Sequence, residues 1–124
     1  MRLSAVEQAR LIRQGEVSAA EMVEAAIAAI EKLNPDLNAV ILPMYDMARA
    51  AVGDLRSEEP LSGVPMLLKD VLAEYAGAPM TEGSRFLRGY VSTRDSELVS
   101  RYRRGGLVMV GRTNAPEFAS KPTT

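Results

Sequence analysis

Cysteine and histidine are both absent from the 124 residues of the sequence. Without cysteine the chain has no disulfide, no zinc site built on cysteine and no thiol nucleophile, and this absence fits the cytoplasmic location that we expect. Without histidine it lacks the most common general base and the most common metal ligand. Any acid–base chemistry must therefore use lysine, tyrosine or a carboxylate, and we expect no metal site.

Aromatic residues and long apolar runs are also scarce. The sequence has two phenylalanines and no tryptophan, so aliphatic side chains and alanine must fill the core. No apolar run approaches the roughly 18 residues of a membrane span, and the opening residues MRLSAVEQARL lack the apolar core of a signal peptide. With 47% apolar and 25% charged residues, the composition is that of an ordinary globular protein, and the length fits one small domain.

The net charge of −1 gives no sign of nucleic-acid or membrane binding, although the two halves of the chain differ. Residues 1–60 carry 6 basic and 10 acidic side chains, whereas residues 61–124 carry 9 and 6. The basic half includes Arg101, Arg103 and Arg104. We interpret this cluster as the solvated end of a helix. A patch for an anion or a nucleic acid is the alternative, and it is disfavoured because Tyr102 is the only aromatic residue among the arginines.

Two S-x-x-E patterns, beginning at Ser4 and Ser18, predict the starts of two helices by the capping-box rule. The first helix is expected to end near Gly15, and the second to end at the NPD triplet of 34–36. The apolar face of the second helix is predicted to contain a stripe of Met22, Ala26, Ile30 and Leu33, with Val23 and Ile27 beside it.

Strands and helices are predicted to alternate along the rest of the chain. The expected elements are a strand at 37–42, a helix at 44–55, a strand at 66–69, a loop at 74–84, a helix with Asp95 as its N-cap, and a strand at 107–110. This alternation indicates the α/β class, with a sheet covered by helices.

The two most apolar strands are separated by one predicted helix, which suits a crossover connection between parallel strands. If the strands are parallel, Lys69 and the Gly111–Asn114 segment lie at the same carboxyl-end edge of the sheet, where open α/β sheets bind ligands. The glycine-rich run RGGLVMVG lacks the G-x-G-x-x-G pattern of a dinucleotide loop. We therefore expect no cofactor.

Lys69 is the residue to which we assign a chemical role. At a position just past a buried strand we expect the lysine to be partly desolvated, which would lower its pKa and let it accept a proton from a hydroxyl group. The alternative is an exposed lysine paired with Asp70. For four further polar positions we favour structural roles in turns or helix ends: Ser84, Thr113, Asn114 and Glu117.

Several segments taken together resemble the amidase signature family. They are PLSGVPMLLKD, then TEGS, then an aspartate-led helix followed by RRGGLVMVGRTNAPEF, while GEVSAAEMVEAAIAAIEKLNPDLNAV is similar to the helical region that precedes them in the family. The resemblance covers essentially the whole chain. It departs from the family pattern at Val71, where many members have Asn, and at Arg112, where many have Lys.

The resemblance implies a large α/β/α domain around a mixed sheet, of which residues 1–124 are the N-terminal portion, helical over 1–57 and entering the catalytic core over 60–124. It also implies amide hydrolysis by a Ser–cis-Ser–Lys triad with Lys69 as the base. The family's two serines belong to a glycine- and serine-rich segment that this sequence does not contain. Three serines of this chain do not match that segment: Ser84, Ser96 and Ser120. We therefore expect the chain alone to be inactive.

Three other functions are left open by the sequence. The chain could instead be a non-catalytic fragment or part of a split enzyme, a piece of the amidase-like component of a tRNA-dependent amidotransferase, or an unrelated α/β binding module. The amidotransferase branch often has Asp before the Glu-Phe pair, where this chain has NAPEF, so we favour a stand-alone amidase for a small, aryl or alkyl amide. The expected partner is that small amide, with no nucleic acid and no membrane, and a homodimer remains open.

Overall fold

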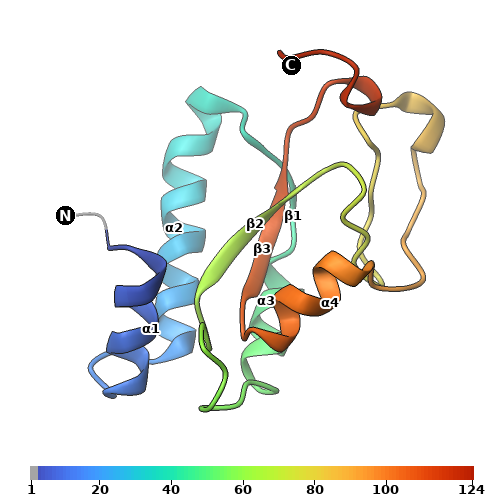
Figure 1. Ribbon diagram of the computed structural model, residues 1–124. Helices are drawn as coiled ribbons and strands as arrows, with labels where there is room; N and C mark the ends of the chain where they lie inside the picture. Colours follow the sequence, from blue (N-terminus) through green and yellow to red (C-terminus); the bar gives the residue numbers. More distant parts are fainter. Residues whose placement is uncertain (1–2) are drawn as a thin grey trace.

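The computed structural model describes residues 3–124 and shows a mixed sheet between helices (Figure 1). The helices are α1 (Ala5–Arg13), α2 (Ala19–Leu37), α3 (Tyr45–Val52) and α4 (Glu97–Arg104), with short 3-10 turns η1 (Arg85–Leu87) and η2 (Glu117–Ala119). The strands are β1 (Val40–Pro43), β2 (Pro65–Lys69) and β3 (Val108–Thr113). The predicted α/β class is confirmed.

The sheet has the strand order β1-β3-β2. β2 and β3 run parallel, as predicted, while β1 pairs antiparallel with β3. Pro43 can end β1 without losing a ladder hydrogen bond because β1 is an edge strand and proline has no N–H to donate.

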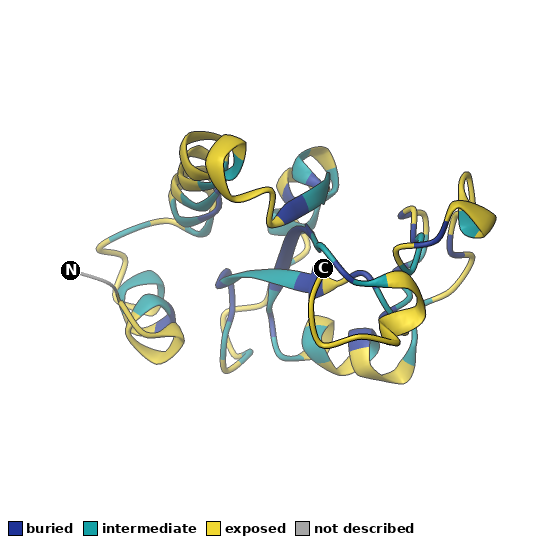
Figure 2. Cartoon of the chain, turned by 90° about the horizontal axis from the view of Figure 1, so that it is seen from above, coloured by how far each residue is buried: buried dark blue, intermediate teal, exposed yellow. Residues whose placement is uncertain are grey.

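Two hydrophobic clusters pack on opposite faces of the sheet, because side chains of β3 alternate between them. One cluster joins α2 and α3 to the sheet and contains Val23, Ile27, Ala48, Val108 and Val110. The other lies under α4 and the loop before it and contains Met44, Leu68, Ala73, Tyr75, Ala78, Val99 and Met109. Figure 2 shows the buried residues gathered in the strands and in the helix faces toward them. This layering places helices on both faces of the sheet, in which β2 ends with Lys69.

Both predicted capping boxes are present. Ser4 and Ser18 each accept a hydrogen bond from the backbone N–H of the glutamate three residues later, whose carboxylate accepts from the serine N–H in return. Gly15 follows the end of α1 with φ +71°, a conformation that glycine adopts without strain. The predicted boundaries of α1 are therefore confirmed.

The predicted end of the second helix is wrong. α2 runs through Pro35 to Leu37 and stops at Asn38, which takes the left-handed conformation with φ 47°. The side chain of Asn34 bonds both the N–H and the carbonyl of Val40, at 2.8 Å each, and so fixes the turn into β1. The first strand consequently begins at Val40 rather than at residue 37. The helix buries Val23 and Ile27, which were predicted to lie beside the apolar stripe, and leaves Leu33 of the stripe half exposed.

Three other predicted boundaries need correction. The helix predicted at 44–55 is the shorter α3, which ends before Gly53. Ser96, and not Asp95, caps α4, because its side chain accepts the N–H of Val99 while Asp95 accepts the N–H of Ala76. The strand predicted at 107–110 continues to Thr113, because all of Val108–Thr113 is held by neighbouring strands. Among residues 3–124, none of the helices combines the length and apolar character that a membrane crossing requires.

Candidate active site

The carboxyl ends of β2 and β3 lie side by side (Figure 1). Lys69, the last residue of β2, pairs in register with Thr113, the last residue of β3. The Lys69 side chain is exposed, so the predicted partial desolvation of its amine is wrong, and its Nζ donates a hydrogen bond to the backbone carbonyl of Asn114. The prediction that Lys69 and the Gly111–Asn114 segment share one edge of the sheet is therefore confirmed.

The alternative pairing of Lys69 with Asp70 is wrong. Asp70 is completely buried, on the face of the strand opposite to the Lys69 side chain, because successive residues of extended chain point to opposite faces. Its carboxylate accepts hydrogen bonds from Thr81, at 2.6 Å from the hydroxyl and 3.1 Å from the backbone N–H. Asp70 thus binds the strand end to the loop that contains Thr81.

Arg112 is the buried cation that faces Asp70. Its side chain is completely buried, and its Nε lies 4.0 Å from Oδ1 of Asp70. Its Nη1 donates to the carbonyl of Ala73 at 2.8 Å and approaches the carbonyl of Lys69 at 3.4 Å. Burial lowers the pKa of Arg112, and the Asp70 carboxylate opposes this shift. Sequence reasoning missed this pair, although strand alternation after Lys69 was a signal that could have placed Asp70 inside.

The loop at 81–84 packs tightly on the segment that follows β3. At Gly83, with φ +67°, an added Cβ would lie 2.4 Å from the carbonyl oxygen of Ala115, so glycine is required at this close approach. The Ser84 hydroxyl donates to the Glu117 carboxylate at 2.7 Å, and the Phe118 N–H donates to the carbonyl of Glu82 at 2.8 Å. Glu117 lies in the first turn of η2, as predicted, and it also ties that turn to the loop.

The three serines considered from the sequence all make local hydrogen bonds. Ser84 caps η1, Ser96 caps α4, and the hydroxyl of Ser120 donates to the carbonyl of Glu117 at 2.7 Å. None of these contacts involves Lys69. The structure therefore brings Lys69 together with Thr113 and Asn114, and gives the three serines structural roles.

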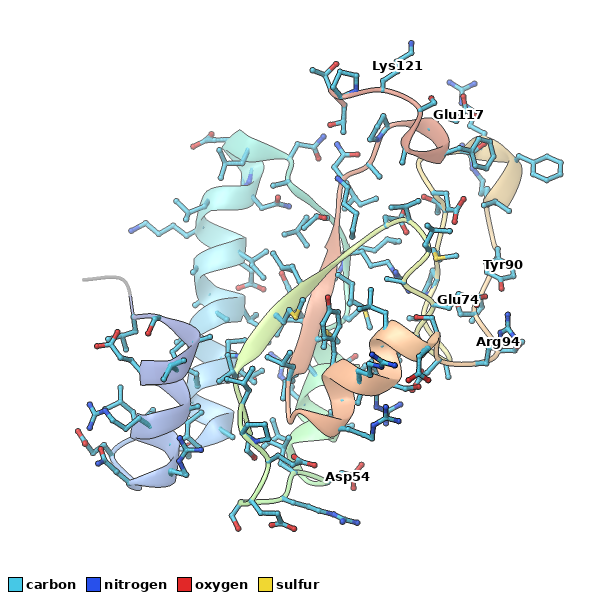
Figure 3. The ribbon with its side chains drawn as sticks, viewed as in Figure 1. Asp54, Glu74, Tyr90, Arg94, Glu117 and Lys121 are labelled. Atoms are coloured by element: carbon cyan, nitrogen blue, oxygen red, sulfur yellow. The ribbon has the colours of Figure 1, made fainter. Side chains whose placement is uncertain are left out.

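A second polar cluster holds the long loop before α4 (Figure 3). The Tyr90 hydroxyl donates to the Glu74 carboxylate at 2.8 Å, and Arg94 contacts the other carboxylate oxygen at 3.4 Å. The hydrogen bond from Tyr90 and the charge of Arg94 hold the pKa of Glu74 below its ordinary value of 4.5. The cluster pins the two ends of the 74–94 loop to each other.

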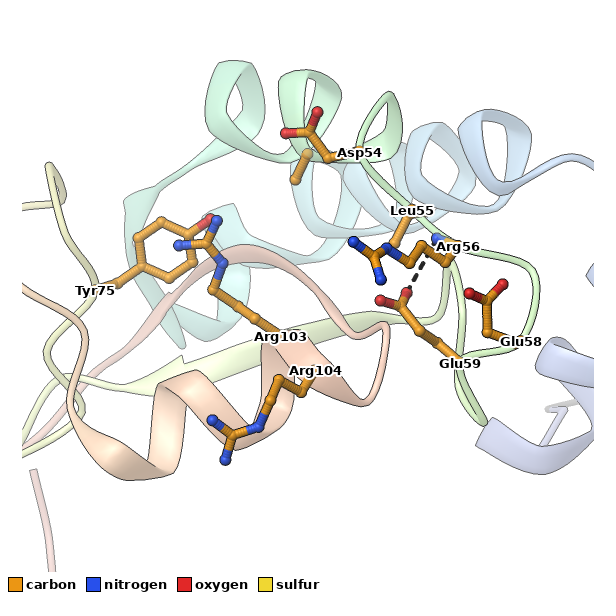
Figure 4. A pocket seen from close by; sticks show the side chains of 9 residues that line it. Asp54, Leu55, Arg56, Glu58, Glu59, Tyr75, Arg103 and Arg104 are labelled. Atoms are coloured by element: carbon orange, nitrogen blue, oxygen red, sulfur yellow. Dashed lines mark hydrogen bonds between the residues drawn. The ribbon is translucent and has the colours of Figure 1, made fainter.

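A surface cavity of about 510 Å³ lies beside α4 (Figure 4), and its lining includes none of the residues at the carboxyl ends of β2 and β3. It is lined by Ala51, Asp54, Leu55, Arg56, Glu58, Glu59, Tyr75, Arg103 and Arg104. The guanidinium of Arg103 lies 5.1 Å from the centre of the Tyr75 ring and 2.8 Å from the Asp95 carboxylate. Arg101 and Arg104 both pair with Glu97. All three arginines of the basic cluster thus have acidic partners, which supports the helix-end interpretation.

Comparison of the sequence and the structure with known proteins identifies the family to which the chain belongs. The family model named Amidase matches residues 21–124. The chain belongs to the amidase signature family. The fold agrees, because the solved structure of 6-aminohexanoate cyclic dimer hydrolase superimposes with a TM-score of 0.93 at 38% identity, covering 98% of this chain and 25% of that one. A bacterial aryl acylamidase of the same family superimposes with a TM-score of 0.84 at 31% identity, covering 94% of this chain and 26% of that one.

Two sequence relatives illustrate the range of this family. The 6-aminohexanoate-cyclic-dimer hydrolase of Paenarthrobacter ureafaciens is 40% identical over 122 residues, which are 97% of this chain and 24% of that protein. A component of the glutamyl-tRNA(Gln) amidotransferase of Salinispora arenicola is 40% identical over 129 aligned residues, covering 98% of this chain and 26% of that protein. This amidase family chain thus spans about a quarter of the length of these relatives.

Proposed function

We propose that this chain supplies the lysine base of a Ser–cis-Ser–Lys amidase, and that Lys69 is this base. The observation that carries the proposal is the place of Lys69, an exposed amine at the carboxyl end of a strand in a parallel pair, in an amidase family chain without histidine. Two serines outside residues 1–124 complete the triad. Relatives named as hydrolases support hydrolysis of a carboxylic amide as the reaction.

The chemistry assigned to Lys69 is proton transfer. Its neutral amine accepts the proton of the bridging serine, which accepts the proton of the nucleophilic serine as that oxygen attacks the amide carbonyl. The leaving amine departs with a proton, an acyl-enzyme forms, and water then releases the acid. The hydrogen bond to the Asn114 carbonyl holds the Lys69 amine at the carboxyl end of β2, where the bridging serine would have to approach it. The Asn114 contact thus fits an oriented base.

Residues 1–124 alone are expected to release no product, because a base without its two hydroxyl partners has nothing to activate. The family's complete polypeptide is expected to act in the cytoplasm on a small, aryl or alkyl amide. The names of the two hydrolase relatives make a cyclic amide and an aryl amide the first substrates to try.

A second function is supported by the 40% identity to the glutamyl-tRNA(Gln) amidotransferase component. In that case the ammonia set free from an amide is transferred to a glutamyl-tRNA and is not released to the solvent. The NAPEF segment, which lacks the Asp that this branch often carries before Glu-Phe, favours the stand-alone hydrolase.

The test uses the complete polypeptide that carries residues 1–124, incubated with the 6-aminohexanoate cyclic dimer, an anilide and benzamide. The expected result is release of acid with ammonia or amine, and an acyl adduct found by mass spectrometry on a serine outside residues 1–124. Amidation of glutamyl-tRNA without free hydrolysis would favour the second function. An acyl adduct on Ser84, Ser96 or Ser120 would contradict the proposed triad.

A further inference from the structure

The face of the strand end opposite to Lys69 carries a buried ion pair that the proposed reaction does not use directly. Asp70 and Arg112 are both completely buried, and Arg112 lies next to the end of β2, where it pairs in register with Leu68. Burying two charges is costly unless the surrounding hydrogen bonds compensate for the loss of water. The cost of burying this pair suggests that it has a role at this position, on the face of the strand end opposite to the candidate base.

Asp70 fixes the backbone on the C-terminal side of Lys69. Its N–H donates to the carbonyl of Thr113 at 3.2 Å, which extends the parallel ladder by one residue beyond β2. Its carboxylate accepts two hydrogen bonds from Thr81, and the hydroxyl of Thr81 in turn accepts the N–H of Gly83 at 3.3 Å. Asp70 thereby joins the strand end to the loop that packs on the segment after β3.

Arg112 fixes the same backbone from the neighbouring strand. Its Nη1 binds the carbonyl of Ala73 and lies within reach of the carbonyl of Lys69 itself. The turn between these carbonyls includes Leu72 with φ 57°, which is unfavourable for a leucine and is held in place by its surroundings. Within residues 3–124, Nε and Nη2 of Arg112 have no hydrogen-bond partner, and the Asp70 carboxylate, 4.0 Å from Nε, is the opposite charge that faces them.

We propose that Asp70 and Arg112 are positioning residues, which hold the Lys69 backbone so that its amine stays against the Asn114 carbonyl and faces the bridging serine. This inference rests on the proposed role of Lys69 as the base. Displacing a reacting group by about 1 Å costs on the order of 100-fold in rate. A purely structural pair would instead affect stability and leave the rate per folded molecule unchanged.

The test compares Asp70→Asn, Arg112→Met and Arg112→Lys in the complete polypeptide, with kcat calculated per folded molecule. We expect Asp70→Asn and Arg112→Met to lower kcat about 10- to 100-fold with KM little changed. Arg112→Lys keeps the cation and should retain most of kcat. A matched control comes from the ion pair of Asp95 and Arg103, because Asp95, like Asp70, accepts a backbone N–H and faces an arginine, here through a guanidinium hydrogen bond of 2.8 Å. Asp95→Asn should lower the melting temperature and leave kcat unchanged.

A readout independent of activity follows from the lysine content. Residues 1–124 contain the lysines Lys32, Lys69 and Lys121, and reductive methylation of the complete polypeptide with 13C-formaldehyde labels them together with its other amines, so Lys69→Arg serves to assign the Lys69 signal. Asp70→Asn should move the NMR signal of the Lys69 methyl groups and leave those of Lys32 and Lys121 in place. Unchanged signals for all three lysines, or a folded Asp70→Asn protein with the kcat of the parent, would overturn the inference.

Two further variants keep the test decisive. If Asp70→Asn does not fold, Thr81→Val removes only the hydroxyl bonded to Asp70 and should lower kcat in the same direction, whereas an unchanged kcat would overturn the inference. Lys69→Ala, measured beside these variants, separates the two proposals. If Lys69→Ala is inactive and Asp70→Asn is fully active, the positioning role of Asp70 is contradicted and the role of Lys69 as the base stands. If Lys69→Ala is fully active, the proposed function itself is contradicted.

Discussion

The two N-terminal helices and the strand end around Lys69 are held by different kinds of contact. In α1 and α2 the decisive hydrogen bonds join residues three positions apart, as in the reciprocal bonds of Ser18 and Glu21. At the strand end the decisive bonds join residues far apart in sequence, such as Arg112 with Ala73 and Ser84 with Glu117. Local contacts are set by neighbouring residues, whereas the strand end exists only when the sheet and two loops are assembled together.

The largest expected effect is at the strand end. Arg112→Met removes a buried cation and its bond to the Ala73 carbonyl, and leaves Asp70 buried without a counter-charge. Breaking one side of a buried ion pair costs about 3–5 kcal/mol. The free energy of unfolding, measured by urea denaturation, should fall by about that amount. A change no larger than that of a surface variant would show that the buried pair does not hold the strand end.

A smaller effect is expected in the N-terminal region. Ser18→Ala removes the side-chain acceptor that caps α2, and loss of an N-cap costs about 1 kcal/mol. The loss should appear in urea denaturation, while hydrogen exchange at the Lys69 strand end should stay as in the parent protein. Equal loss of hydrogen-exchange protection in both regions would show that the N-terminal helices and the strand end are not stabilised independently.

The dependence of stability on pH tests the local contacts in another way. Hydrogen bonds from the backbone and hydroxyl of Ser18 hold the pKa of Glu21 below its ordinary value of 4.5. A carboxyl whose pKa is lower in the folded state stabilises it above about pH 4.5, and this contribution disappears as the pH falls through the folded pKa. The melting temperature should therefore fall less between pH 6 and pH 3 in Glu21→Gln than in the parent protein. The difference should be small, because it comes from one exposed carboxylate. An unchanged acid profile would contradict the capping role of Glu21.

The smallest effect is expected on the outer face of α4. Arg101 and Glu97 form an exposed i, i+4 ion pair at 2.8 Å. Exposed pairs of this kind contribute little, since water already solvates both charges. Arg101→Ala should leave the urea midpoint unchanged within error. A clear destabilisation would mean that the basic cluster contributes to the fold rather than forming a solvated helix end.

The difference between the two regions also explains which predictions from the sequence were confirmed. Capping boxes at Ser4 and Ser18 were visible because a few adjacent positions carry the whole signal. The parallel pairing of β2 and β3 followed from two apolar runs and the helix between them. The fold class and the edge that carries Lys69 could therefore be predicted.

The remaining features depended on contacts that sequence order does not reveal. Pro35 did not end α2, because Asn38 and the side chain of Asn34 provide the actual stop. Asp95 lost the capping position to Ser96 because its carboxylate is taken by Ala76 and Arg103. The Asp70–Arg112 pair brings together residues that are 42 positions apart, and only the assembled sheet makes them neighbours.

The measurement that tests the central claim most directly is kcat of Lys69→Ala and Lys69→Arg in the complete polypeptide, with Lys121→Ala as the matched control for loss of an exposed lysine. Lys69→Ala should lose on the order of 10²–10⁴ in kcat, with binding affected less, because the side chain moves protons rather than holding the substrate. Lys69→Arg should be almost as poor, since arginine stays protonated and cannot accept a proton. Folded Lys69 variants with near-normal kcat, equal to the Lys121 control, would contradict the role of Lys69 as the base.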